Sequence, residues 1–385
     1  MKLVSIVGAR PQFVKLAPLC RAIKNASESA AGVGMESIIL HTGQHYDYLM
    51  SKLFFDQMQI PEPDYNLEVG SGSHAVQTGL MLERIERTLQ ELLPDIVLVF
   101  GDTNSTLAGA LAAAKLNIPV AHVEAGLRSY NRQMPEEINR VLADHASTLL
   151  FCPTLQAVRN LEAEGFDKVI HNIASDGTYE QFLQKTTTSQ PLVIQSGDIM
   201  FDAFRYNEAI AEKSSTILQQ LGLSKSEYSL LTIHRADSTK DADSLKRILD
   251  FVESQGMEGT IVFPVHPRTE NLIREKGMKL PDRILMIPPV GYYDMIALEK
   301  NASLILTDSG GVQKEAFFAR VPCITLRMET EWPETVESGW NRLMSEQPVA
   351  SRQREMIDSQ RYFGDGRSAE VHLKVLVDFC SLKHN

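Results

Sequence analysis

Short apolar runs alternate with amphipathic helical patterns through the first half of the chain. The runs LVSIV, SIILHT and DIVLVF are followed by helical patterns that begin after Pro11, near Tyr48 and after Thr103. The runs PVAHVEA and LLFCP are followed by helical segments at residues 136–145 and 155–164. Strands rich in β-branched residues that alternate with helices are typical of a parallel sheet covered on both faces. The first half is therefore predicted to form one doubly wound α/β domain.

The regular alternation stops between residues 167 and 195 and returns afterwards. That stretch is polar and contains SDG and three threonines in a row, so we interpret it as an interdomain connection with an insertion. From YSLLTIH to PCITL strands and helices alternate again, which predicts a second α/β domain. A chain of 385 residues also exceeds what one hydrophobic core usually supports. We expect domains at residues 1–175 and 176–365, with a helix at 366–385 that packs back on the first domain.

Composition excludes several classes of partner. The formal net charge of -11 is spread along the chain and gives no basic surface for nucleic acid or an anionic membrane. The four cysteines lie far apart without C-x-x-C spacing, so we expect reduced core residues of a cytosolic protein. No apolar run approaches the length of a membrane span. The expected protein is soluble and cytoplasmic.

Charged residues follow the strands of the first domain at the edge where doubly wound sheets bind ligands. Arg10 and Lys15 lie near the start of the first helix, where two cations form an anion clamp or simply face water. Asp102 follows DIVLVF and on its own fits a helix N-cap. Glu124 ends the next strand, and Glu136 opens a helix. Three carboxylates at one edge are what proton abstraction from carbon, or protonation of a leaving group, requires.

The second domain contains the stretch LILTDSGGVQKEAFFAR, which predicts a strand, a tight turn and a helix. Gly310 and Gly311 allow a ligand to approach the backbone, and the first amides of the helix point at an anion. The alternative is an ordinary turn with Asp308 or Ser309 as the helix cap. His234 and His266 follow neighbouring strands, and together with the turn they fit a diphosphate site.

One further carboxylate and several missing motifs narrow the chemistry of this domain. Glu315, just over one turn into the helix, is placed to reach a sugar hydroxyl, or else forms a surface pair with a neighbour such as Lys314 or Arg320. The chain has no H-E-x-x-H and no P-loop lysine motif, and arginines accompany its histidines. The sequence therefore predicts an anion site without metal or a nicotinamide cofactor.

These motifs occur in an order that resembles a known family, the non-hydrolysing UDP-N-acetylglucosamine 2-epimerases. The resemblance covers almost the whole chain and rests on GARPQFVK, HTGQHYDYLM, GDTNSTLAGALAA, HVEAGLRS with PEEINR, TIHRADS, PVHPRT, and LTDSGGVQKEA with TEWPETVE. It implies two Rossmann-like domains in a glycosyltransferase-B arrangement, an active site in the interdomain cleft, a homodimer, and no metal or redox cofactor. By similarity, the catalytic positions are Asp102, Glu124, Glu136 and His234, and the UDP-holding positions are Arg10, Lys15, His266, Ser309, Gly310, Gly311 and Glu315.

The resemblance also implies a reaction. Family members interconvert UDP-N-acetylglucosamine and UDP-N-acetylmannosamine by eliminating UDP, which gives a 2-acetamidoglucal, and adding it back, and this product feeds surface polysaccharide synthesis. TEWPETVE with GWNRL resembles a subgroup that includes 2-epimerases of UDP-2,3-diacetamido-uronates. A hydrolysing epimerase, a glycosyltransferase on the same scaffold and a non-enzymatic binding module are the remaining alternatives. Three carboxylates beside a dianionic ligand argue against the binding module.

Overall fold

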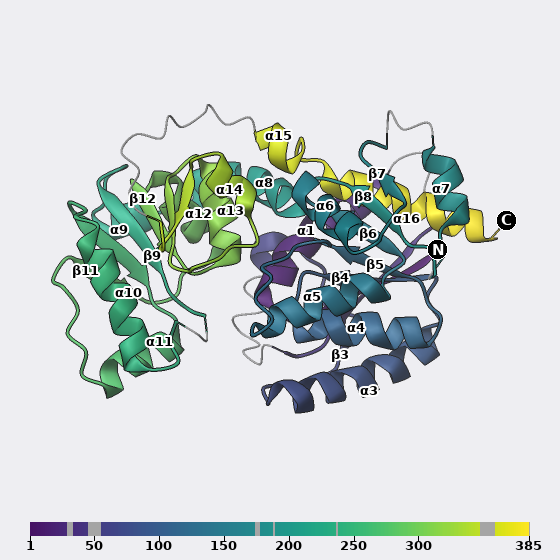
Figure 1. Ribbon diagram of the computed structural model, residues 1–385, viewed down its shortest axis with the longest axis horizontal. Coiled ribbons are helices and arrows are strands. Elements are labelled where there is room, and N and C mark those ends of the chain that lie inside the picture. Colours follow the sequence, from purple (N-terminus) through teal and green to yellow (C-terminus); the bar gives the residue numbers. More distant parts are fainter. Residues whose placement is uncertain are drawn as a thin grey trace. The chain divides into compact units, whose positions relative to one another are not determined.

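The computed structural model describes residues 1–28, 34–44, 55–173, 178–187, 189–235, 238–346 and 359–384. The chain divides into two compact units, shown by sequence colour in Figure 1. The first comprises Met1–Ala203 with Ser359–Asn385, and the second comprises Phe204–Asp358. Each unit has its own parallel sheet. The predicted class, two Rossmann-like α/β units, is confirmed by these sheets.

The sheet of the first unit has the strand order β3-β2-β1-β4-β5-β6-β8-β7, and neighbouring strands are parallel. Its strands are β1 (Lys2–Val7), β2 (Glu36–His41), β3 (Tyr65–Asn66), β4 (Ile96–Phe100), β5 (Val120–Val123), β6 (Leu149–Cys152), β7 (Val169–Ile170) and β8 (Leu192–Gln195). The helices of this unit are α1 (Arg10–Glu28), α3 (His74–Leu92), α4 (Asn104–Lys115), α5 (Pro135–Ala146), α6 (Leu155–Ala163), α7 (Tyr179–Lys185), α15 (Ser359–Phe363) and α16 (Ser368–His384). The helix predicted near Tyr48 lies outside the described residues.

The core of the first unit forms because its central strands are apolar on both faces. All five residues of β4 are buried, as are five of the six in β1. Helix α4 is rich in alanine and packs closely on the sheet, since a Cβ at Gly109 would lie 3.0 Å from side-chain atoms of both Ile6 and Val99. This close packing holds α4 against β1 and β4.

The stretch at 167–195 is part of the first sheet, so its interpretation as an interdomain connection is wrong. Strand β8 pairs with β6 in register, and β7 pairs with β8. Only three consecutive apolar residues, Leu192, Val193 and Ile194, mark β8, and all three are fully buried. Such a short run between polar neighbours carries too weak a signal to be recognised. The division between the units accordingly falls after Ala203 rather than after residue 175; residues 174–177 and 188 lie outside the described residues.

The second unit is built on the sheet β11-β10-β9-β12-β13-β14, again with parallel pairs. Its strands are β9 (Tyr228–Thr232), β10 (Thr260–Pro264), β11 (Ile284–Ile287), β12 (Leu304–Thr307), β13 (Cys323–Thr325) and β14 (Asn341–Leu343). Its helices are α9 (Ile217–Leu221), α10 (Ala242–Ser254), α11 (Pro267–Glu275), α12 (Tyr292–Asn301), α13 (Gly310–Ala319) and α14 (Pro333–Glu337); α8 (Ile199–Ser214) contains the division between the units.

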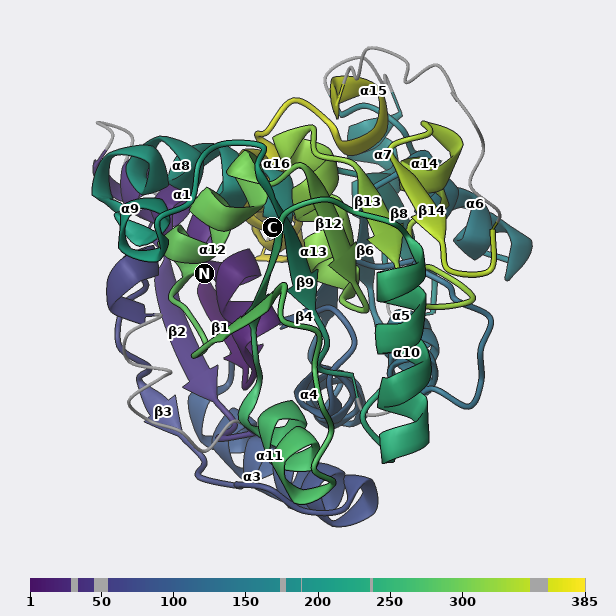
Figure 2. The same cartoon turned by 90° about the vertical axis from the view of Figure 1, so that its left-hand side faces the viewer.

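Alternate residues of the second sheet face two separate apolar clusters. Leu230 packs with residues of α12 and α13, whereas Leu231 packs with residues of α10 and α11. Figure 2 shows α10 and α12 on opposite sides of these strands. Because successive side chains of a strand point to opposite faces, both faces of β9 are covered and the unit is doubly wound.

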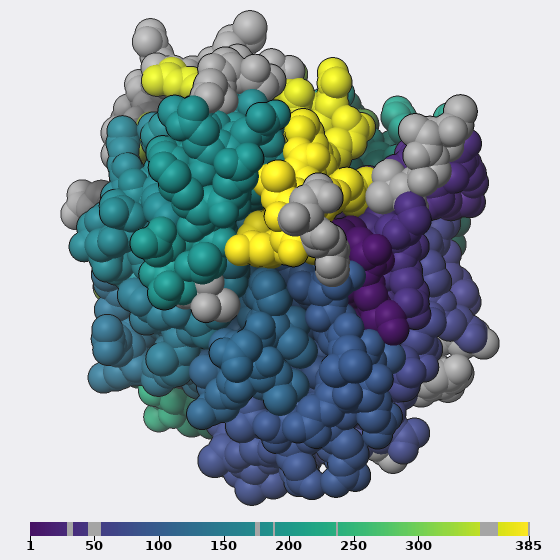
Figure 3. Space-filling view, turned by 90° about the vertical axis from the view of Figure 1, so that its right-hand side faces the viewer, coloured from purple at the N-terminus to yellow at the C-terminus, as the bar shows by residue number. Residues whose placement is uncertain are grey.

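Helix α16 belongs to the first unit although it ends the chain. It packs against α1 and α7, and the Tyr179 hydroxyl donates a hydrogen bond to Asp378 (3.0 Å). Figure 3 shows the yellow C-terminal segment beside the purple N-terminal one on one face of the molecule. The four cysteines are all free thiols, and Cys380 is buried in α16. Within the described ranges we find no helix with the length and apolar character needed to cross a bilayer.

The first turn of α16 is held by a buried carboxyl from α8. Asp202 accepts a hydrogen bond from the Ala369 amide (2.8 Å), which satisfies one of the free N–H groups at the helix start. Burial raises the pKa of Asp202 to about 7, with a further contribution from Asp198 and Asp365, although the amides of α16 act in the opposite direction.

This carboxyl makes the stability of the protein depend on pH. The folded protein keeps the Asp202 proton up to about pH 7, whereas the unfolded chain releases it near the ordinary value of 3.8, so this group's contribution to stability falls as the pH rises between those values. We expect Asp202→Asn to gain about 2 kcal/mol relative to the natural protein between about pH 5 and about pH 8. Urea unfolding at both pH values measures this difference. The exposed control Asp56→Asn should show no such change, and a pH-independent difference for Asp202→Asn would contradict the assignment.

Candidate active site

Asp102 follows β4 and is not the cap of the next helix. Thr103 caps α4, and its hydroxyl accepts from the Thr106 amide (3.3 Å). The Asp102 carboxylate instead pairs with the Arg140 guanidinium, and the Asp102 carbonyl accepts a hydrogen bond from Asn139 (2.9 Å). The Asp102 side chain is 30% exposed. One side of this carboxylate is therefore anchored while the residue remains accessible.

Glu124 follows β5 in an unusual backbone conformation. Its φ of 73° lies in the left-handed region, which costs a non-glycine residue about 1 kcal/mol. The Glu124 amide donates to the Phe151 carbonyl (3.1 Å), and the side chain forms an ion pair with Lys15. Both side chains are more than nine-tenths buried. The alternative that Lys15 faces water is therefore excluded.

The ion pair and the Asp102 turn lie together. A Cβ added at Gly101 would lie 2.8 Å from the Lys15 ammonium nitrogen and 3.3 Å from a Glu124 carboxylate oxygen. Gly101 also has a φ of +64°, which favours glycine. The absence of a side chain at this position leaves room for the pair directly beside Asp102.

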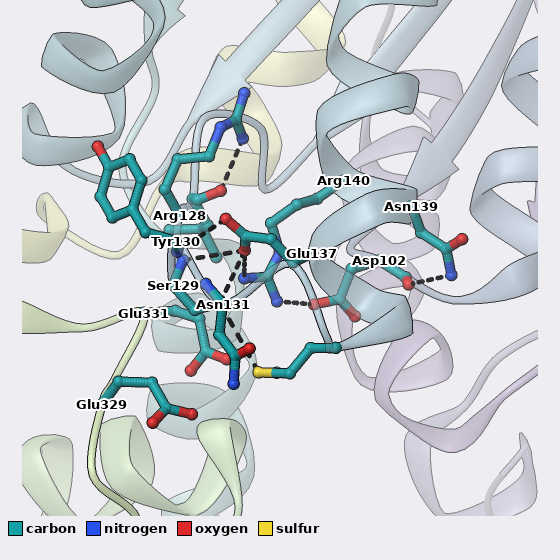
Figure 4. A network of polar contacts seen from close by, with 12 residues as sticks. Asp102, Arg128, Ser129, Tyr130, Asn131, Glu137, Asn139, Arg140, Glu329 and Glu331 are labelled. Carbon is teal, nitrogen blue, oxygen red and sulfur yellow. Dashed lines mark hydrogen bonds and ion pairs between the residues drawn. The ribbon is translucent and has the colours of Figure 1, made fainter.

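Helix α5 contributes two neighbouring glutamates with different surroundings. Glu136 is half-buried in the first turn, where the helix dipole favours a negative charge. Glu137 is buried and accepts from the amide of Ser129 (2.9 Å), the amide of Tyr130 (2.8 Å) and the Arg140 guanidinium (2.8 Å). Figure 4 shows the resulting chain of contacts from Glu137 through Arg140 to Asp102. The sequence offered a signal for Glu137, since it lies three residues before Arg140 on the same helix face.

The glycine turn of the second unit has the predicted local structure. Ser309 caps α13, and its hydroxyl accepts from the Val312 amide (3.4 Å). Asp308 is fully buried and accepts from the amides of His234 (3.1 Å) and Arg235 (3.0 Å). The cap and the anion site are compatible, because a single capping bond leaves other first-turn amides of the helix without an intrahelical acceptor.

Gly310 is not required by packing within the second unit. A Cβ at this position would meet Glu331, Trp332 and Arg235 at 3.7 to 3.8 Å, which is ordinary van der Waals contact. Its φ lies outside the left-handed region. The fold of this unit therefore has room for a methyl group here.

The two histidines of the second unit differ in their surroundings. The His234 side chain is 47% exposed, and its Nδ1 lies 3.4 Å from Asp308. His266 caps α11, where its Nδ1 accepts from the Arg268 amide (3.3 Å). Because Nδ1 accepts a hydrogen bond there, the neutral His266 ring carries its proton on Nε2.

Glu315 is buried, so the alternative of a surface ion pair is wrong. It faces Glu299 of α12, whose side chain is fully buried. Burial, and to a smaller extent the adjacent Glu315 carboxyl, raises the pKa of Glu299 well above its ordinary value. The pair of carboxyls therefore retains a proton. Lys314 is also buried, with its ammonium group 3.9 Å from the centre of the Trp332 ring. Sequence reasoning missed Glu299, which lies in α12, the helix that precedes α13 in the chain.

Two doubly wound units, one carrying a carboxylate cluster and one a glycine turn at a helix start, are typical of enzymes that act on nucleotide-linked substrates. A family model described as UDP-N-acetylglucosamine 2-epimerase matches residues 28–376, and the chain belongs to this family. The resemblance seen in the motifs is thereby confirmed, and the chain is an isomerase-type enzyme.

Curated relatives cover nearly the whole chain. A protein of Methanocaldococcus jannaschii named UDP-N-acetylglucosamine 2-epimerase is 42% identical over 98% of this chain and 99% of its own length. A UDP-2,3-diacetamido-2,3-dideoxy-D-glucuronate 2-epimerase of Pseudomonas aeruginosa is 44% identical over 89% and 88%. The crystal structure of the Methanocaldococcus jannaschii epimerase in complex with UDP-GlcNAc and UDP matches 98% of this chain and 99% of its own, with a TM-score of 0.81 and 41% identity.

Gly126 and Gly310 differ in how much space the fold leaves for a side chain. At Gly126 the φ is +79° and an added Cβ would lie 2.4 Å from the Ala157 carbonyl oxygen. We expect Gly126→Ala to lower the free energy of unfolding by about 2 kcal/mol or more, because the clash is with backbone. We expect Gly310→Ala to leave that free energy unchanged to within about 1 kcal/mol. Urea unfolding of both variants tests the contrast, and equal losses would contradict it.

Proposed function

We propose that this chain interconverts UDP-N-acetylglucosamine and UDP-N-acetylmannosamine by inverting carbon 2 of the sugar. The names of several relatives and the bound ligands of the epimerase structure support this substrate. The observation that carries the proposal is the buried Lys15–Glu124 pair beside the Asp102 turn, because carbon 2 must lose and regain a proton. Carboxylates held at fixed positions supply that chemistry.

The proposed route is elimination of UDP to a 2-acetamidoglucal, followed by addition of UDP with a proton delivered to the other face. One carboxylate among Asp102, Glu124 and Glu136 takes the proton from carbon 2, and another returns it. Lys15 contacts Glu124 directly, so we propose that it orients this carboxylate in addition to any contact with the nucleotide. The roles proposed for Arg10 and His234 follow from the family resemblance.

The second unit is proposed to hold the departing UDP. The N-terminus of α13, with Ser309, Gly310 and Gly311, favours the negative diphosphate through amide donors and the helix dipole. His266 is proposed to contact the same diphosphate, and Glu315 to bind the ribose. The Glu315 carboxyl faces Glu299, which retains a proton and is thereby able to donate a hydrogen bond to it.

One relative favours a second substrate for this chain, a UDP-diacetamido-uronate. The Pseudomonas aeruginosa relative is named as an epimerase of UDP-2,3-diacetamido-2,3-dideoxy-D-glucuronate, at an identity similar to that of the N-acetylglucosamine epimerases. Inversion at carbon 2 is the same reaction in both cases. A homodimer and a role in surface polysaccharide synthesis follow from the family resemblance, and a cytoplasmic location follows from the spacing of the four cysteines; these complete the proposal.

The reaction is tested by incubating the protein with UDP-N-acetylglucosamine in deuterated water. Deuterium at carbon 2 of both epimers, without release of free sugar, is the expected result. Free N-acetylmannosamine with UDP would indicate a hydrolysing epimerase, and a requirement for an acceptor would indicate a glycosyltransferase. Exchange only with the diacetamido-uronate would assign the second substrate. No exchange with either sugar nucleotide would overturn the proposal.

If Glu124 transfers the carbon 2 proton, substituting it should slow proton exchange at carbon 2 without weakening UDP binding. Glu124→Gln should lower carbon 2 exchange by about a hundredfold or more, because an amide neither takes nor returns the proton. The dissociation constant for UDP should stay within about twofold, since the α13 amides and His266 that are proposed to hold the diphosphate are unchanged. Mass spectrometry of exchange and calorimetry of UDP binding measure the two effects. The exposed control Glu162→Gln should match the natural protein, and normal exchange in Glu124→Gln would exclude Glu124.

A further inference from the structure

A fully buried carboxylate of α5 lies between the two turns that carry Asp102 and Glu124. Asp144 Oδ1 lies 2.7 Å from His122 Nδ1. Asp144 Oδ2 accepts from the Gly126 amide (3.1 Å) and from the Arg128 guanidinium (2.7 Å). No part of the proposed proton chemistry uses Asp144 directly, and its side chain has no exposed surface.

The geometry around His122 fixes the proton of one ring nitrogen. Its Nε2 lies 2.7 Å from the Gly101 carbonyl oxygen, which only accepts hydrogen bonds, so Nε2 carries a proton. Burial favours the neutral form of Asp144, but His122 and Arg128 outweigh it and lower the pKa of this carboxyl. Nδ1 faces this carboxylate at 2.7 Å, so the buried ring joins the Gly101 carbonyl to Asp144.

The hydrogen bonds of His122 and Asp144 reach both turns, the one that carries Asp102 and the one that carries Glu124. The His122 ring holds the carbonyl of Gly101, the residue before Asp102, and Asp144 holds the amide of Gly126, two residues after Glu124. Both turns contain left-handed backbone, with φ of +64° at Gly101 and 73° at Glu124. Backbone in such conformations persists where its surroundings hold it in place.

We propose that Asp144 is a positioning residue that sets the separation and orientation of the Asp102 and Glu124 carboxylates, acting through the His122 ring and the Gly126 amide. This inference rests on the proposed function, because the two carboxylates are taken to be its proton-transferring groups. Small displacements of such groups reduce turnover strongly, about a hundredfold for about 1 Å. The proposed diphosphate contacts at the start of α13 belong to the other unit.

The same network offers a matched control at its far end. Arg128 also forms two hydrogen bonds to Glu164 (2.6 and 2.7 Å), whose side chain is 27% exposed. Within the described part of the chain, Glu164 hydrogen-bonds to Arg128 and His145, whereas the Gly101 carbonyl and the Gly126 amide are held by His122 and Asp144. Glu164→Gln therefore loosens the charged network without releasing either turn.

The first experiment compares kcat and KM for Asp144→Asn and Glu164→Gln, at a temperature where circular dichroism shows both folded. Asp144→Asn should lower kcat about tenfold to a hundredfold, with KM and the UDP dissociation constant within about twofold. Glu164→Gln should keep kcat within about twofold of the natural protein. Unchanged kcat in Asp144→Asn, or equal losses of kcat in both variants, would overturn the proposal.

The second experiment needs no variant and remains decisive if Asp144→Asn does not fold. Nitrogen-15 NMR of the natural protein labelled at histidine should show a proton on His122 Nε2, held in a hydrogen bond. A His122 ring without a proton on Nε2 would overturn the proposal, because its hydrogen bond to the Gly101 carbonyl would then be absent. If the natural protein shows this proton but no epimerase activity, the proposed function fails while the contacts of Asp144 stand. If it is active without this proton, only this inference fails.

Discussion

The parallel direction of every pair in both sheets is the constraint on which the rest of the structure depends. Parallel strands all end at the same edge, so residues that follow different strands meet there although they are far apart in the chain. In the first unit this brings Lys15, Asp102 and Glu124 together from the segments after β1, β4 and β5. In the second unit it joins His234, after β9, to Asp308, after β12. Neither site has its geometry without the register of the strands behind it.

Burial of charge is the second organising feature, and it explains why the site of the first unit is rigid. An unpaired buried charge is very costly, so each buried ion must keep its partner. Lys15 and Glu124 satisfy each other, and Arg140 joins Glu137 to Asp102. Groups fixed in this way do not have to reorganise when a reaction develops charge beside them. The same contacts explain why the left-handed backbone at Glu124 is maintained.

Much of this arrangement is predictable from the sequence, because apolar runs and the polar residues after them are local features. The two doubly wound units, the cap at Ser309 and the position of Glu124 at a strand end all follow from such patterns. What the pattern does not reveal depends on partners remote in the chain. The strand at 192–195 is recognisable only through its pairing with β6, and Glu299 gains significance only beside Glu315. His122 looks like a stray polar residue in an apolar strand until Gly101 and Asp144 are seen on its two sides.

The protonation of buried groups changes how the molecule behaves in an electric field. The formal charge of -11 counts every aspartate and glutamate as negative. In the folded protein Glu299 retains a proton, and Asp202 keeps its proton up to about pH 7. Between about pH 5 and about pH 7 the folded protein is therefore less negative than its unfolded chain, in which both carboxyls are ionised. Unfolding in this range should strengthen the retention of the chain on an anion exchanger.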